Sequence, residues 1–407
     1  MKILFIHQNF PGQYRALAPS MVKLGHEVMA ISSRKETSIQ GIPNICYDSP
    51  RNSSKNIHPW LQSTEAAIIR GQAVARSVEL LMKNGFVPDA IVGHAGWGEM
   101  QFVRQVAPQA RITSFCEYFY HGQGSDVDFD PEFPAAPDAM LRCHARNLHL
   151  TSALVDSDVG LSPTEWQASQ FPDFLRQRIE VCHDGIETDR LTPHKEAWIK
   201  LGRDNIKAQL GDEIITFINR NLEPMRGYHS FMRALPHILA ERPKARVILL
   251  GGNEVSYGPA PATGGGYKAQ FLREVQDKID LSRVHFVGQV PYGTMVNMLR
   301  ISAVHVYLTV PFVLSWSMLE AMSLGCCVVG SATPPVQEVI THGQNGLLVD
   351  FFEPKAIAQQ VCEVLARPKD HQELRRAARA HVVQHYDYQR VCLPRHHRII
   401  TGQSMPA

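Results

Sequence analysis

The sequence predicts an α/β protein built from two Rossmann-like domains, and three observations support this fold class. At 407 residues the chain is too long for one ordinary hydrophobic core and suits two domains of roughly 200 residues each. In both halves, short apolar runs alternate with segments of helical periodicity, which is the pattern of parallel sheets. A turn-rich stretch from Asp184 to Pro193 separates the halves. We therefore place the domains at residues 1–185 and 190–384.

The first half begins with a βαβ unit. Ile3 to Ile6 are apolar, helical spacing follows from Ala16 to Leu24, and a second apolar run covers residues 27–31. Strands of the same kind are expected at 88–94, 112–115, 159–162 and 179–183, with helices at about 61–84 and 139–152. The second half repeats the alternation, with strands at 214–218, 246–252, 284–288, 304–308, 326–330 and 346–350.

The stretch from Pro311 to Gly325 lies between two of these strands and is predicted to be a loop that turns into a helix. A helix that begins at the carboxyl edge of a parallel sheet presents N–H groups and a positive dipole end, so Ser315 is a candidate phosphate contact. Glu320 has two interpretations. It fits a capping box with Ser317, or its carboxylate accepts two hydroxyls of a ribose.

Two arginines flank the turn that follows the strand at 214–218. Arg220 and Arg226 carry guanidinium forks that suit a diphosphate, and Gly227 permits close approach of the backbone. The alternative is that both are ordinary solvated surface arginines.

Three residues of the first half lie where ligands bind in open α/β sheets. His94 ends a predicted strand, and Glu117 belongs to an aromatic and acidic cluster of a kind that suits hydroxyl-rich ligands. Gly12 lies in the first turn, where a glycine lets the backbone approach an anion or substrate. Each also has a plain structural interpretation: a hydrogen-bonded histidine, a cover for the core edge, and a turn glycine.

Composition excludes several classes of function. The 41 basic and 39 acidic residues give a net charge of +2, so no global field favours nucleic acid. The histidines show no metal-ligand spacing, and no metal site is expected. The eight cysteines form no C-x-x-C pair, and the first strand is too short for a signal peptide. We therefore expect a cytoplasmic protein and leave peripheral contact with the inner face of the membrane open.

These pieces, in this order, resemble the retaining glycosyltransferases of family 4 (group 1), which have the GT-B fold. The most specific match is residues 285–350, including His285-Phe286-Val287-Gly288, Leu319 to Gly325, and Gly343 to Val349. The resemblance implies two Rossmann-like domains that face a central cleft, with a C-terminal helix at about 385–407 packed back on the first domain. It also implies sugar transfer from a nucleotide-sugar donor to a glycan, a lipid-linked or another glycoconjugate acceptor, with no other cofactor.

The resemblance also implies a role for each candidate residue. Arg220, Arg226, Gly12 and Ser315 would contact the diphosphate, Glu320 the ribose, and the backbone around Val290 the base. His94, Glu117, Phe312 and Leu314 would lie near the donor sugar or acceptor, and His94, Arg220 and Arg226 would be catalytic.

One position departs from the family pattern. The family has a pair of glutamates separated by seven residues, and Phe312 stands where the first of them is expected. This departure motivates an alternative function, a nucleotide-sugar-binding protein without catalysis. A nucleotide-sugar epimerase of the same fold is kept as a second enzymatic alternative. The base, the sugar, the acceptor and the oligomeric state are not fixed by the sequence.

Overall fold

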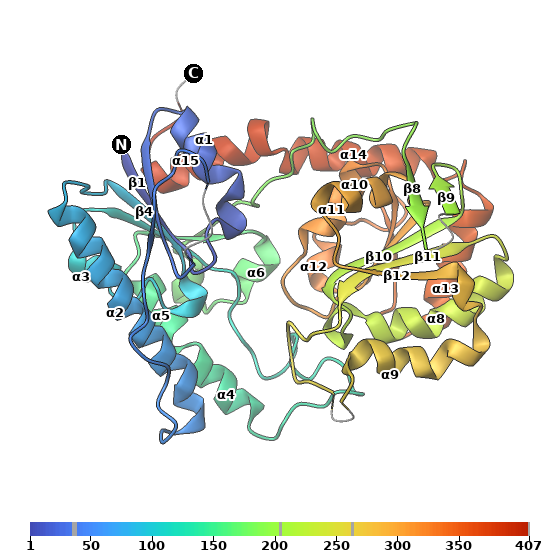
Figure 1. The fold of residues 1–407 in the computed structure, drawn as a ribbon, viewed down its shortest axis with the longest axis horizontal. Coiled ribbons are helices and arrows are strands. Elements are labelled where there is room, and N and C mark those ends of the chain that lie inside the picture. Colours follow the sequence, from blue (N-terminus) through green and yellow to red (C-terminus); the bar gives the residue numbers. More distant parts are fainter. Residues whose placement is uncertain (35–38, 203–205, 262–263, 406–407) are drawn as a thin grey trace. The chain divides into compact units, whose positions relative to one another are not determined.

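A parallel seven-stranded sheet forms the centre of the first of two units in the computed structural model, which describes residues 1–34, 39–202, 206–261 and 264–405. This unit comprises Met1–Gly185 and Tyr388–Ala407 (Figure 1). Its strands run in the order β3-β2-β1-β4-β5-β6-β7. They are β1 (Lys2–Ile6), β2 (Glu27–Ser32), β3 (Asn44–Cys46), β4 (Ala90–His94), β5 (Arg111–Phe115), β6 (Val159–Ser162) and β7 (Ile179–Val181).

Helices cover both faces of this sheet because successive residues of a strand point to opposite faces. Ile3 and Phe5 pack with α1 and α15, whereas Leu4 and Ile6 pack with α2, α3 and α5. The helices of the unit are α1 (Leu17–Lys23), α2 (Gln62–Lys83), α3 (Val103–Val106), α4 (Ala139–Arg146), α5 (Leu148–Val155), α6 (Glu165–Ser169), α7 (Asp173–Arg176) and α15 (Leu393–Thr401).

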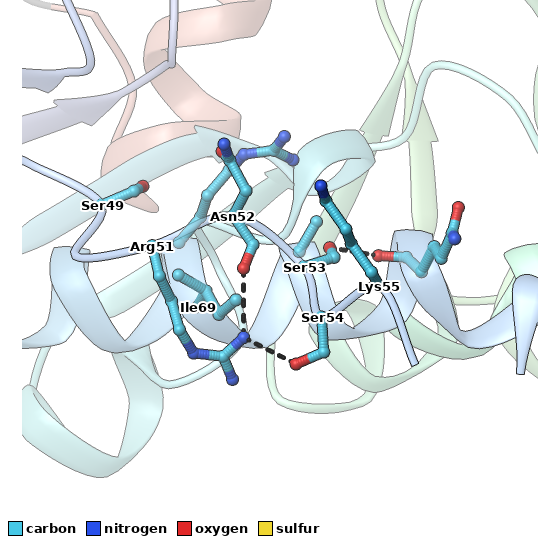
Figure 2. Close-up of a pocket in the computed structure, with 10 residues that line it drawn as sticks. Ser49, Arg51, Asn52, Ser53, Ser54, Lys55 and Ile69 are labelled. Carbon is cyan, nitrogen blue, oxygen red and sulfur yellow. Dashed lines mark hydrogen bonds between the residues drawn. The ribbon is translucent and has the colours of Figure 1, made fainter. Parts of the chain in front are cut away.

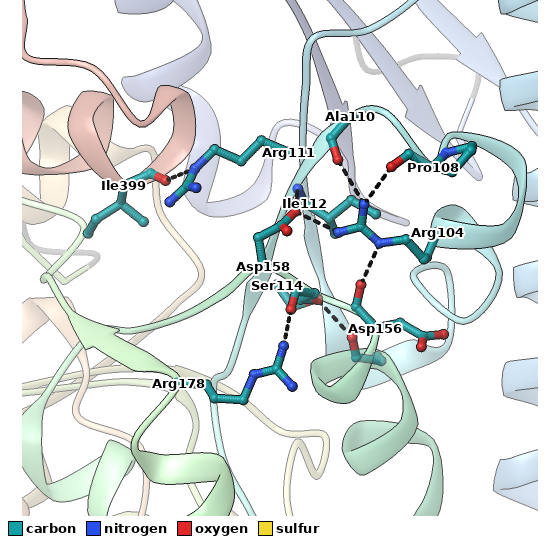
Figure 3. A network of polar contacts seen from close by, with 12 residues as sticks. Arg104, Pro108, Ala110, Arg111, Ile112, Ser114, Asp156, Asp158, Arg178 and Ile399 are labelled. Carbon is teal, nitrogen blue, oxygen red and sulfur yellow. Dashed lines mark hydrogen bonds and ion pairs between the residues drawn. The ribbon is translucent and has the colours of Figure 1, made fainter.

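A polar network fixes β5 between its neighbours (Figure 3). Arg104 of α3 donates to the carbonyls of Pro108, Ala110 and Asp156 and forms an ion pair of 2.6 Å with Asp158. The same carboxylate accepts the backbone N–H of Ile112 at 2.7 Å. The turn before β5 is therefore held to the turn before β6.

The second unit, Ile186–Asp387, repeats this architecture with six parallel strands in the order β12-β11-β10-β13-β14-β15. The strands are β10 (Ile214–Asn221), β11 (Arg246–Gly252), β12 (Val284–Gly288), β13 (Val304–Tyr307), β14 (Cys327–Ser331) and β15 (Leu347–Val349). Figure 1 shows α8 (Tyr228–Glu241), α9 (Gly266–Val275) and α13 (Pro354–Ala366) on one face of the sheet. On the other face lie α10 (Tyr292–Arg300), α11 (Trp316–Ser323) and α14 (Gln372–Tyr386), and α12 (Pro334–Gln337) follows β14.

One local expectation differs from the structure, and three strands were not predicted. The helix expected at 139–152 is two helices, because the buried side chain of Asn147 pairs with both backbone groups of Tyr120 instead of facing solvent. The strands that were not predicted are the edge strand β3 and an antiparallel pair, β8 (Trp198–Leu201) and β9 (Ile206–Gln209), which precedes β10.

Candidate functional site

Arg226 is a buried cation at the carboxyl edge of the second sheet. Its side chain follows β10 in the short helix Pro224–Arg226, and the residue is 6% exposed. Nη1 donates to Thr309 Oγ1 at 2.8 Å and to the carbonyl of Val313 at 2.9 Å. No carboxylate of the described residues lies within ion-pair distance. The buried carboxyl of Glu223 acts on this guanidinium electrostatically without forming an ion pair, and a buried guanidinium that lacks a directly bonded acid is well suited to an anionic ligand.

Two aromatic rings flank this guanidinium. Its central carbon lies 5.3 Å from the ring centre of Tyr257 and 5.7 Å from that of Phe312, and the two rings meet edge to face at 5.0 Å. Such contacts stabilise a cation and exclude water from it. Phe312, which stands in place of the family glutamate, therefore packs beside Arg226 itself.

Glu223 fixes the loop that carries Tyr257. Its buried carboxylate accepts the backbone N–H groups of Ser256, at 3.2 Å, and Tyr257, at 3.0 Å. Burial raises the pKa of Glu223, while the N–H bonds from Tyr257 and Ser256 act in the opposite direction. Because this carboxylate is bonded to the loop backbone, we assign Glu223 the role of positioning Tyr257.

Arg220 has a different environment. It lies near the end of β10, is exposed, and its guanidinium makes no hydrogen bond or ion pair within the described ranges. The protein therefore does not fix the guanidinium of Arg220 by hydrogen bonds, as it fixes that of Arg226. Its side chain is free to reach a bound ligand.

Helix α11 begins at the carboxyl edge of the sheet, after β13. Ser315 is its N-cap residue, with Oγ accepting from the backbone N–H of Ser317, while Ser315 N–H donates to the Tyr307 hydroxyl at 2.8 Å. The interpretation of Ser317 and Glu320 as a capping box is therefore wrong, because Glu320 lies beyond the first turn. The helix directs its positive dipole end towards this edge.

Glu320 is buried and accepts a hydrogen bond of 2.7 Å from the hydroxyl of Tyr292. Burial, followed by the neighbouring Glu320, raises the pKa of Tyr292, so the phenol remains a donor. Val290 lies two residues before Tyr292, and both side chains are partly buried against the hydrophobic core cluster of the second unit that includes residues of α11. Leu314 lies within that cluster, 5% exposed, so its side chain is part of the core.

In the first unit, the structure brings three predicted residues together around His94, which ends β4. Gly96 N–H donates to His94 Nδ1 at 2.9 Å, so Nδ1 is an acceptor and Nε2 is the nitrogen left to donate. Nε2 lies 3.6 Å from a carboxylate oxygen of Glu117, and the ring stacks on Trp97 with centres 3.9 Å apart. His94 and Glu117 together offer a donor and an acceptor, as a sugar hydroxyl requires.

Gly12 adjoins this group through His7. A Cβ on Gly12 would lie 2.4 Å from His7 Cε1, and its φ of +48° also favours glycine. The His7 ring lies edge-on to both His94 and Trp97. Burial and the neighbouring His94 lower the pKa of His7 to about 3, so this ring is neutral.

Four residues of these environments were not identified from the sequence: His7, Trp97, Tyr257 and Tyr292. Only His7 could have been identified from the sequence, because it directly follows the first strand and so lies at the same edge of the sheet as His94, which ends a later strand. Among the residues that the structure describes, no three His, Cys, Asp or Glu side chains are grouped to hold a metal ion. No helix in the described ranges is long and apolar enough to cross a membrane.

Two protein-family models match the chain. Residues 24–191 match a model described as glycosyl transferase family 4 group, and residues 202–381 match glycosyl transferases group 1.

Curated relatives share about a quarter of their residues with this chain. A D-inositol 3-phosphate glycosyltransferase of Corynebacterium urealyticum is 25% identical over 197 residues, which are 48% of this chain and 44% of the relative. Spore coat protein SA of Bacillus subtilis is 24% identical over 55% of this chain and 58% of its own length. The chain thus spans about half the length of the curated relatives it matches.

Solved structures match over nearly the whole chain. A sucrose-phosphate synthase of Thermosynechococcus elongatus has a TM-score of 0.68 at 17% identity and covers 97% of this chain and 96% of its own. Anabaena HepE, solved in complex with UDP, has a TM-score of 0.66 at 15% identity, over 95% and 96% of the two chains. The fold class expected from the sequence, two Rossmann-like domains of the GT-B type, is confirmed.

Proposed function

This chain belongs to the family 4, group 1, glycosyltransferases, and from that premise we propose that it transfers a sugar from a nucleotide diphosphate sugar to a glycan or other glycoconjugate acceptor. We further propose that the anomeric configuration is retained and that neither a metal ion nor another cofactor is required. The observation that carries the proposal is the buried guanidinium of Arg226, which has hydrogen-bond partners but no acidic one among the described residues.

Cleavage of the anomeric bond leaves negative charge on the diphosphate and positive charge on the sugar. Arg226, held next to the start of α11, neutralises the departing diphosphate, and the exposed Arg220 adds a second fork. Low solvent exposure around Arg226 strengthens this interaction. Ser315 and Gly12 are the remaining candidate diphosphate contacts.

The other candidates have roles at the two ends of the donor. Glu320, oriented by Tyr292, binds the ribose, and the backbone at Val290 contacts the base. The Nε2–H of His94 and the carboxylate of Glu117 bind hydroxyls of the donor sugar or acceptor. In the second unit, Phe312 and the backbone of Leu314 are the candidate contacts of the donor sugar or acceptor.

Calorimetric titration of UDP, GDP and ADP into the full chain tests this proposal. The Arg226→Gln variant is expected to bind the preferred nucleotide at least tenfold more weakly, because it loses a charge-assisted contact. Arg226→Lys keeps the charge and shows whether the fork is needed. Arg273→Gln, an exposed arginine on α9, is the matched control and is expected to bind as the natural chain does. Unchanged binding in Arg226→Gln would refute the assignment.

A second candidate, a nucleotide-sugar-binding protein without transfer, is favoured by one observation: the aromatic Phe312 packs where the family has a sugar-contacting carboxylate. Release of nucleoside diphosphate from a donor sugar in the presence of an acceptor extract supports transfer. Tight donor binding with neither transfer nor hydrolysis supports the second candidate. Conversion of the donor without any acceptor would instead support an epimerase.

A further inference from the structure

A polar cavity of about 330 Å³ lies in the first unit, and none of the candidate residues above lines it. One wall is the segment before α2, and the other is the first turns of α2 itself (Figure 2). We call it the α2 pocket; its lining residues are Ser49, Arg51, Asn52, Ser53, Ser54, Lys55, Gln62, Ala66, Ile69 and Arg70. Its volume is at the lower end of the range for small-molecule sites and suits one or two sugar rings.

The loop wall of this pocket is already fixed by internal bonds. Glu65 accepts from the backbone N–H of Ser54 at 2.8 Å and pairs with Arg51 at 2.7 Å. Ser53 donates to the carbonyl of Gln62 at 2.8 Å. These bonds fix the loop without a ligand, so a ligand would not have to order it on binding.

The pocket carries positive charge that is only partly compensated, since the buried carboxyl of Glu99 acts on Arg70 from a distance but forms no ion pair with it within the described residues. None of its ten lining residues is acidic, and Glu65 compensates only Arg51. Within the described part of the chain, neither Lys55 nor Arg70 has a carboxylate at ion-pair distance. Figure 2 shows the side chains of Lys55 and Asn52 pointing to one side of the loop and that of Arg51 to the other. Lys55 is exposed, so its ammonium group is available to a ligand.

The pocket also offers groups that suit hydroxyls. The side-chain amides of Asn52 and Gln62 and the hydroxyl of Ser49 make no hydrogen bond inside the described structure. An amide presents both donors and an acceptor, which is what a sugar hydroxyl needs. Cations next to amides therefore favour a ligand that is both anionic and rich in hydroxyls.

One residue links this pocket to His94. Arg70 donates from Nη1 to the carbonyl of Trp97 at 2.9 Å, and the indole of Trp97 stacks on the His94 ring. A ligand held by Arg70 thus lies one residue away from the group proposed to contact the donor sugar or acceptor.

We propose that the α2 pocket binds the anionic part of the acceptor, a phosphate or a carboxylate attached to a sugar, with Lys55 and Arg70 as its counter-charges. This inference rests on the proposed function, because it identifies the chemical class of the acceptor. It makes Lys55 a specificity-determining residue for charged over neutral acceptors.

The test is ligand-observed NMR on the full chain with three probes: glucose 6-phosphate, glucuronic acid and glucose. Both anionic probes are expected to bind at least tenfold more tightly than glucose, and added salt is expected to weaken them. In Lys55→Gln their affinity is expected to fall about tenfold, the effect of one hydrogen bond to a charged group. Lys83→Gln, at the C-terminal end of α2 and also exposed, is the matched control and is expected to leave binding unchanged.

The outcomes separate phosphate from carboxylate and this inference from the proposed function. Binding of only one anionic probe identifies which group the acceptor carries. Equal binding of glucose, or equal loss in both lysine variants, overturns the inference, and so does inorganic phosphate binding as tightly as glucose 6-phosphate. Titration of UDP into the same samples reports on the second unit. If the natural chain binds UDP but neither anionic probe, the pocket alone is refuted; if it binds the anionic probes but no nucleoside diphosphate, the proposed function alone is refuted.

Discussion

Gly227 follows Arg226 at a position where the fold leaves little room for any other residue, and its substitution tests how Arg226 is held. Its φ is +64°, and a Cβ built on it would lie 2.4 Å from Cβ of Leu308. Left-handed backbone costs a non-glycine residue about 1–2 kcal/mol, and overpacking a core adds about 1–3 kcal/mol. Gly227→Ala is therefore expected to destabilise the second unit by about 2–5 kcal/mol.

Two other glycines separate these contributions. Gly211 has a φ of +101° and no atom within 4 Å of its Cβ position, so Gly211→Ala reports the backbone cost alone. Gly293 lies in α10 with open space around it and no positive φ, so Gly293→Ala is expected to stabilise by about 0.5–1 kcal/mol. The measurement is calorimetric unfolding of each full-length variant, with each unit allowed its own transition. A Gly227→Ala variant as stable as Gly211→Ala would refute the predicted clash with Leu308.

Three further expectations concern stability and binding. Burial lowers the pKa of His305 to about 3, so as pH falls below about 6.5 the histidine takes up a proton in the unfolded chain but not in the folded one. The free energy of unfolding then falls by up to about 1.4 kcal/mol per pH unit. Urea midpoints measured between pH 7 and pH 4 that do not fall more steeply than those of His305→Gln would contradict this. Arg104→Gln is expected to destabilise the first unit by about 1–3 kcal/mol because it leaves backbone carbonyls unpaired. The control Arg142→Gln breaks only the exposed ion pair with Asp138 and is expected to cost at most about 0.5 kcal/mol in the same unfolding assay. Tyr292→Phe removes the donor to Glu320 and is expected to weaken nucleoside diphosphate binding about fivefold by calorimetry; unchanged affinity would argue against a ribose-binding Glu320.

The alternation of strands and helices could be predicted from the sequence because parallel strands buried on both faces leave continuous apolar runs. The pair β8 and β9 was missed because each strand has only four residues, too few for a clear pattern, and lies outside the βα alternation. The break at Asn147 was missed for another reason. Its cause is a pair of bonds to Tyr120, 27 residues away, and local periodicity carries no trace of them.

The candidate site shows the same limit. Arg226 could be identified because charge, a following glycine and a strand end are neighbours in the sequence. Its aromatic cover could not be predicted, because the position of Tyr257 depends on bonds from its loop to Glu223, 34 residues earlier. The capping-box interpretation failed because Ser315 and Ser317 are both good caps, and only the path of the chain decides between them.

The position of Phe312 bears on the choice between a transferase and a silent binding protein. A carboxylate beside Arg226 would form an ion pair with it, and a bound diphosphate would compete with that pair. An aromatic ring instead keeps the guanidinium dry without neutralising it, together with Tyr257. Apart from the distant effect of Glu223, the charge of Arg226 is then available for the negative charge that develops on a leaving diphosphate, which is the moment at which electrostatic stabilisation accelerates a reaction. Under the proposed roles, Phe312 in place of a glutamate would remove a sugar contact and keep the leaving-group contact, which favours transfer with altered donor preference over a loss of catalysis.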